Sequence, residues 1–104
     1  MPEDGVTRLF VRCGERYTPP ADGREWTIVT LPEEVRAEHL PGAVAQVRER
    51  LRHFRDAHVL IAGPVALGVA LGQGLAHEPT AIDYVQLNQT TKEFEVWLTN
   101  RRNL

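Results

Sequence analysis

The apolar residues of the chain fall into short runs and longer periodic segments, and each kind predicts a different element. Five short runs, several of them rich in β-branched or aromatic residues, are bounded by Gly, Pro or polar clusters and favour β-strands. They lie at residues 6–11, 26–31, 58–62, 82–87 and 94–99. The third run, HVLIA, is uninterrupted, which is typical of a strand buried on both faces in a parallel sheet.

Two longer segments have helical character. In residues 42–55 the apolar side chains are spaced by three, four and three positions, at Val44, Val47, Leu51 and Phe54, which is one face of a helix. Residues 64–77 are apolar nearly all round but contain three glycines, at positions 68, 72 and 74. An interior glycine costs about 1 kcal/mol relative to alanine. We therefore expect this helix to approach a sheet or a partner helix closely.

The order of these elements predicts an α/β fold. The pattern β-β-α-β-α-β-β, with a long loop at residues 13–25, indicates one small Rossmann-like domain over residues 1–104 with a largely parallel sheet. Right-handed crossovers make the second, third and fourth strands parallel, and we expect the second and third to pair. A hairpin makes the fifth strand antiparallel. The orientation of the first strand stays open. Residues 33–39 have room for one or two helical turns.

Composition narrows the class of protein. The 104 residues carry a formal charge of −2, which argues against broad binding to long nucleic acid. The single Cys13 cannot form an internal disulfide, the N-terminus lacks a signal-peptide pattern, and no apolar stretch approaches the ~20 residues of a membrane span. We therefore expect a cytoplasmic protein that does not bind membranes.

Candidate chemistry follows from the rule that open α/β sheets bind ligands beyond the carboxyl ends of their parallel strands. The third strand ends at Gly63 and Pro64, before a helix whose free N–H groups suit a phosphate. The loop after the fourth strand supplies polar side chains, namely Asn88, Gln89, Thr90, Thr91 and Lys92. If the first strand is parallel to the others, the loop after it adds Arg12, Cys13, Glu15, Arg16 and Tyr17. Cations, amides and hydroxyls around a helix N-terminus are groups that bind anions.

Structural explanations compete with this interpretation. Gly-Pro is a common strand–helix junction, residues 88–93 make an ordinary polar turn, and Arg12 and Arg16 have Glu15 and Asp22 as possible ion partners.

The sequence lacks the spacings of several well-known sites. Spacings for a P-loop, a dinucleotide fingerprint, a zinc site or a Gly-x-Ser-x-Gly elbow are absent, and the chain has no serine. The acidic cluster at Glu33, Glu34 and Glu38 fits a helical surface. Any catalysis is expected to need no metal and no cofactor.

The run HVLIAGPVALGVALGQGL followed by AIDYVQLNQ resembles the SAVED sensor domains of bacterial antiviral signalling and their CARF relatives. In those domains an apolar strand ends in a small-residue-Pro turn, a Gly- and Ala-rich helix follows, and the next strand carries aromatic and polar residues. The strand at Trp26 also resembles an upstream strand of the family. The matching positions are Ala62, Gly63 and Pro64; Ala70, Leu71 and Gly72; and Tyr84 and Gln86.

The resemblance implies binding of cyclic oligonucleotides, above all the cyclic oligoadenylates made by type III CRISPR complexes. SAVED domains contain two CARF-like halves around the ligand, and this chain has the length of one, so a homodimer is expected. Small stand-alone proteins of this kind look like ring nucleases, in which a ribose 2′-OH attacks the adjacent phosphate. The residues expected to act are Arg12, Arg16, Tyr17 and Lys92 in catalysis, and Gly63, Pro64, Asn88, Gln89 and Thr90 in ligand binding. Alternatives are a non-catalytic binder of the same ligand and a small protein-interaction subunit.

Overall fold

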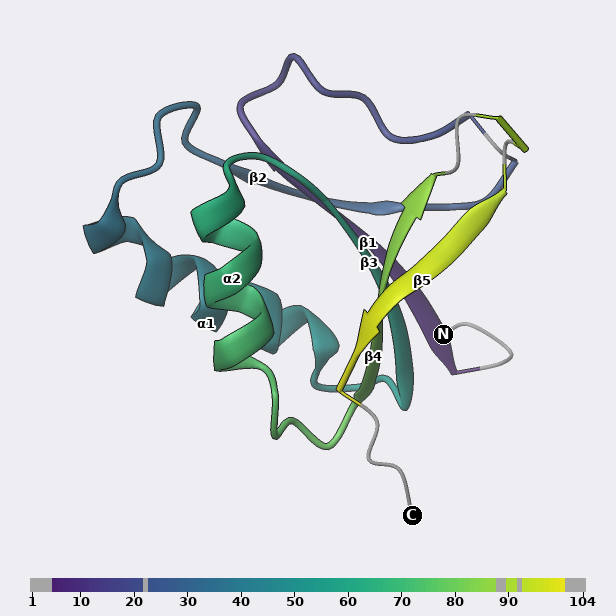
Figure 1. Ribbon diagram of the computed structural model, residues 1–104. Helices are drawn as coiled ribbons and strands as arrows, with labels where there is room; N and C mark the ends of the chain where they lie inside the picture. The colour runs from purple at the N-terminus through teal and green to yellow at the C-terminus, as the bar shows by residue number, and fades with distance from the viewer. Residues whose placement is uncertain (1–4, 22, 88–89, 92, 101–104) are drawn as a thin grey trace.

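The alternation of apolar and polar residues produces a five-stranded sheet with two helices (Figure 1). The computed structural model describes residues 5–21, 23–87, 90–91 and 93–100. The elements are β1 (Val6–Cys13), β2 (Thr27–Leu31), the 3-10 turn η1 (Ala37–His39), α1 (Leu40–Leu51), β3 (Asp56–Ala62), α2 (Val65–Gly74), β4 (Ala81–Leu87) and β5 (Phe94–Thr99). The prediction of an α/β fold with a largely parallel sheet and two helices is confirmed.

The strands are ordered β2-β1-β3-β4-β5; the first four are parallel and β5 is antiparallel to β4. The prediction that the second and third strands pair is wrong, because β1 lies between them. In β1 the consecutive residues Leu9, Phe10 and Val11 are all buried, so both faces of this strand are covered and it suits the centre of a sheet. Its parallel orientation brings its carboxyl end to the same edge of the sheet as that of β3.

Both helices lie on one face of the sheet (Figure 1), because both right-handed crossovers step across the sheet in the same direction. The core between them includes Leu9 and Val59 from the sheet, Val47 from α1, and Leu67 and Leu71 from α2. A hydrogen bond and an ion pair of Arg48 also link α1 to the C-terminal end of α2 and the residues that follow it. The guanidinium of Arg48 donates to the carbonyl of Gly74 (3.0 Å) and forms an ion pair with Glu78 (3.3 Å).

On the other face of the sheet, no helix occurs among the described residues. The segment between β1 and β2 reaches instead toward the start of β5. The rings of Trp26 and Phe94 lie 5.5 Å apart, and the Arg24 guanidinium lies 5.9 Å from the centre of the Phe94 ring. This long loop therefore has packing contacts with the far end of the sheet.

The helix boundaries differ from the predicted ones near their ends. The first helix spans 40–51 rather than 42–55, and the second spans 65–74 rather than 64–77. Pro64 is the N-cap of α2, with an extended backbone, rather than its first helical residue. Glu33 and Glu34 lie on a bend before η1 and not on a helical surface, as expected where Pro32 interrupts the backbone hydrogen bonding. Neither helix of the described part has the length and apolarity to cross a bilayer.

Candidate functional site

A crevice opens where the chain leaves β1 and β3 in opposite directions, toward β2 and toward β4. Ligands of open α/β sheets bind at such a topological switch point. The cavity has a volume of about 400 Å³ and is named here the switch-point crevice. Its lining comes from the ends of β1, β2 and β3, and consists of Cys13, Arg16, Tyr17, Glu33, Glu34, Val35, Gly63 and Pro64.

Gly14 shapes the wall on the β1 side. Its φ of +79° lies in the left-handed region that glycine tolerates best. Its N–H donates to the carbonyl of Leu31 (2.9 Å), which ties the ends of β1 and β2 together. A Cβ at position 14 would lie 3.2 Å from the Cβ of Glu33. The absence of a side chain therefore lets Glu33 pack closely beside this turn.

Arg16 and Tyr17 carry the polar chemistry of the β1 loop. The Arg16 guanidinium donates to the hydroxyl of Tyr17 (3.2 Å) and lies 5.0 Å from the centre of its ring. Arg12 does not line the crevice. Its guanidinium donates to Thr30 Oγ1 (2.9 Å) and to the Tyr17 carbonyl (2.8 Å). Arg12 is therefore placed to position the loop, while Arg16 and Tyr17 face the cavity.

The β3 side of the crevice is formed by Gly63, Pro64 and the N-terminus of α2. A Cβ at Gly63 would lie 2.8 Å from Cys13 Sγ, so only glycine lets the helix start this close to β1. Within the described residues, no side chain caps the N-terminus of α2. The first N–H groups of a helix carry partial positive charge and favour an anion. Burial raises the pKa of the Cys13 thiol, which disfavours a thiolate nucleophile at this position.

Glu33 and Glu34 are crevice residues that the sequence analysis assigned to a helical surface. Their position in the sequence could have predicted this placement. They follow the carboxyl end of β2, and the loop after a parallel strand lies at the same edge of the sheet as the other carboxyl ends. A carboxylate within reach of a reacting hydroxyl can act as a general base, so these two side chains are the candidates for that role in the crevice. The crevice thus brings together a cation, a phenol, two carboxylates and a helix N-terminus.

Only part of the β4–β5 connection belongs to the described residues. Asn88, Gln89 and Lys92 lie outside the described residues, so their predicted roles stay predictions. Thr90 is exposed and is not among the residues that line the crevice. In the described chain the pairing of β3 with β4 ends at Val59 and Tyr84. Beyond that point β4 bends away toward the hairpin (Figure 1).

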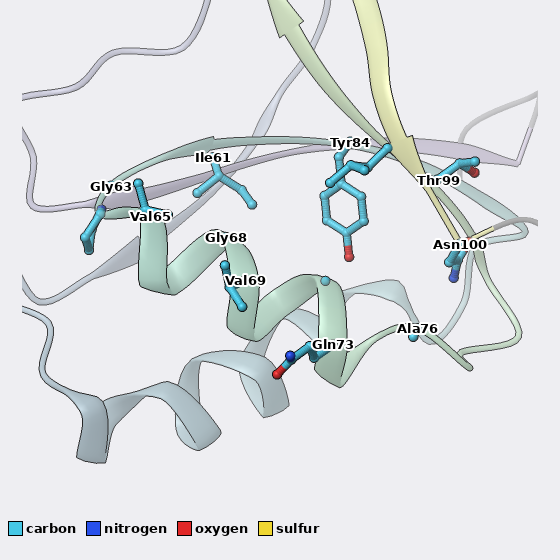
Figure 2. A pocket seen from close by; sticks show the side chains of 13 residues that line it. Ile61, Gly63, Val65, Gly68, Val69, Gln73, Ala76, Tyr84, Thr99 and Asn100 are labelled. Carbon is cyan, nitrogen blue, oxygen red and sulfur yellow. The ribbon is translucent and has the colours of Figure 1, made fainter.

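A second, larger cavity lies between α2 and the strands β4 and β5, and Figure 2 shows it. It has a volume of about 600 Å³ and is named here the α2 groove. The lining is mainly apolar: Ile61, Gly63, Pro64, Val65, Gly68, Val69, Gly72, Gln73, Ala76, Tyr84, Leu98, Thr99 and Asn100. The Tyr84 hydroxyl donates to the carbonyl of Leu71 (3.2 Å), and burial raises the pKa of Tyr84 to about 12. The phenol is therefore uncharged at neutral pH.

The described residues contain no cluster of three or more His, Cys, Asp and Glu side chains that could hold a metal ion. His58 lies 3.9 Å from Asp83. These two residues pair across β3 and β4 and belong to neither cavity.

No protein-family model matches the chain, and neither the curated proteins nor the solved structures contain a match.

Proposed function

We propose that this protein binds a cyclic oligoadenylate at the switch-point crevice and opens the ring by metal-independent phosphodiester cleavage. It would act as a CARF- or SAVED-like half domain in type III CRISPR antiviral signalling, in the cytoplasm. The observation that carries the proposal is the composition of the crevice. Arg16, Tyr17, Glu33 and Glu34 line one cavity with Gly63 and with Pro64, the N-cap of α2, at the edge of the sheet where α/β folds bind nucleotides.

The chemistry requires positioning and charge stabilisation. A ribose 2′-OH attacks the adjacent phosphorus and the bond from phosphorus to the 5′-oxygen breaks, leaving a 2′,3′-cyclic phosphate and a 5′-OH. Glu33 or Glu34 accepts the proton of the 2′-OH, and water or the Tyr17 phenol protonates the leaving oxygen. Arg16 and the N-terminus of α2 stabilise the negative charge that builds on the phosphate. Lys92 is proposed as a second cation, from the β4–β5 connection.

The size of the crevice supports a homodimer. A cavity of about 400 Å³ is at the small end of ligand sites and suits one nucleotide unit rather than a whole ring. A two-fold symmetric pair of crevices would enclose a ring whose own units repeat, and two-fold dimers are the commonest closed assembly.

The proposal predicts a split between turnover and binding. Arg16→Ala should slow cleavage by ~10²–10³ and weaken binding much less, because the charge it stabilises develops mainly in the transition state. Arg50→Ala, which removes an exposed cation from α1, is the matched control and should change neither quantity. Single-turnover rates and dissociation constants for the same cyclic oligoadenylate provide both readouts.

Two further variants identify the base. Glu33→Gln and Glu34→Gln keep the size of each side chain and remove the carboxylate that would accept the proton, so one of them should slow cleavage much more than it weakens binding. Cleavage should continue in EDTA. Inhibition by EDTA that manganese reverses would contradict the metal-independent mechanism, and unchanged rates in all three crevice variants would contradict the site. Binding without any product would identify a non-catalytic binder instead.

A further inference from the structure

The α2 groove and the switch-point crevice meet at Gly63 and Pro64, which line both cavities. In Figure 2, Gly63 and Val65 lie at one end of the groove, and Ala76 and Asn100 lie at the other. A molecule anchored at the N-terminus of α2 can therefore extend from the polar crevice into the groove without leaving the protein surface. The two cavities differ in chemistry, so one molecule that fills both must be polar at one end and apolar at the other.

The groove suits a flat ring. On one side, α2 presents Gly68 and Gly72, where a Cβ would meet no heavy atom within 4 Å. The backbone of the helix is thus open to close approach by a ligand. On the other side, the Tyr84 side chain projects between the sheet and α2 (Figure 2), and Ile61 and Leu98 extend the apolar wall.

A few polar groups are placed to orient such a ring. Gln73 and Tyr84 are among the residues that line the groove. The Tyr84 hydroxyl donates its proton to the Leu71 carbonyl, and its oxygen can still accept a hydrogen bond from a ligand. A volume of about 600 Å³, mainly apolar walls and few polar groups are the usual attributes of a small-molecule site. Val65 is 84% exposed and Leu98 is 68% exposed, so a ligand here would cover apolar surface that now faces water.

We propose that the α2 groove binds the heteroaromatic base of the nucleotide whose phosphate lies in the switch-point crevice. This inference rests on the proposed function and extends it, because it assigns the base a site between α2 and Tyr84. The base would gain burial against the glycine backbone and the tyrosine ring, while Arg16 and the N-terminus of α2 hold the phosphate.

The test uses a variant, Gly68→Leu, whose new side chain on α2 would occupy the groove. Gly68→Leu should fit without disturbing the core, because the space beyond Gly68 is open, and Gly42→Leu is the control at an equally open position on α1. The probes are adenosine 5′-monophosphate and ribose 5-phosphate, which lacks the base. Gly68→Leu should weaken binding of the monophosphate by about tenfold or more, equivalent to about 1.4 kcal/mol, and leave ribose 5-phosphate unchanged. Gly42→Leu should bind both probes as the unaltered protein does.

A direct readout on the unaltered chain keeps the test independent of folding. Titration with adenosine 5′-monophosphate should shift the amide resonances of Gly72 and Tyr84, and ribose 5-phosphate should not. Equal binding of a cyclic oligoadenylate by Gly68→Leu and the unaltered chain would overturn the base site and leave the proposed function standing. Failure of the unaltered chain to bind any of these probes would overturn both. Loss of a dimer in Gly68→Leu with unchanged nucleotide binding would assign the groove to a second copy and overturn the base site.

Discussion

At the residue scale, Tyr84 shows how one side chain serves both the core and a surface cavity. Its ring packs against the core and also lines the α2 groove, and its hydroxyl bonds to α2 through the Leu71 carbonyl. The resemblance to sensor domains singled out this residue from its strand position. Its contact with the helix does not follow from sequence spacing, because it depends on how α2 lies over β4.

Tyr84 should make stability depend on pH in the alkaline range. Burial raises its pKa from 10.0 to about 12, so between these values the folded state binds more protons than the unfolded state. The free energy of unfolding therefore falls as pH rises from 10 to 12 and is unaffected by this group below 10. Urea unfolding at several pH values should show a shallower fall for Tyr84→Phe. Parallel curves for the two proteins would contradict the assignment.

The sequence could place some residues at the crevice, but it could not show how the Arg12 side chain is used. Arg16, Tyr17, Gly63 and Pro64 could be predicted, because they directly follow strands whose carboxyl ends share an edge. The role of Arg12 could not, since it depends on side-chain bonds to Thr30 and to the Tyr17 carbonyl.

At the element scale, the glycines of α2 have different reasons to be glycine. A Cβ at Gly74 would lie 2.6 Å from Val44 Cγ1 on α1, so this position provides the close helix approach that the sequence predicted. Gly68 and Gly72 face the open groove instead. Composition alone cannot separate these cases, because the sequence does not reveal which side of α2 faces α1.

Alanine substitutions should separate the two kinds of glycine. Gly72→Ala should raise the free energy of unfolding by about 0.5–1 kcal/mol, because alanine loses less backbone entropy on folding. Gly74→Ala should lower it by about 1–3 kcal/mol through overpacking against Val44. Urea denaturation curves give both values. Equal effects at the two positions would show that α1 and α2 do not approach as described.

The strand and helix positions could be predicted, and the place of β1 in the sheet could not. Each run of β-branched and aromatic residues became a strand within about two residues of its predicted ends. Sheet order depends on long-range pairing, which local periodicity does not encode. The burial of Leu9, Phe10 and Val11 in succession marks β1 as central, yet in sequence those residues resemble those of β2.

At the scale of the whole molecule, the described chain forms one sheet and one core, with a radius of gyration of 13.2 Å, near the ~13 Å expected for a single domain of about this size. The switch-point crevice, which has room for about one nucleotide unit, and the proposed ring-shaped ligand together predict a two-fold dimer. Light scattering at tens of micromolar protein should give twice the chain mass of 11.7 kDa. A monomeric mass, with and without cyclic oligoadenylate, would contradict the shared site.

The most direct test of the central claim is incubation of the protein in EDTA with cyclic tri-, tetra- and hexa-adenylate, followed by chromatography of the products. We expect one of these rings to be converted to linear oligoadenylate ending in a 2′,3′-cyclic phosphate. Arg16→Ala should slow that conversion and Arg50→Ala should not. Recovery of all three rings intact, after incubation with protein at a molar excess over the ligand, would contradict it.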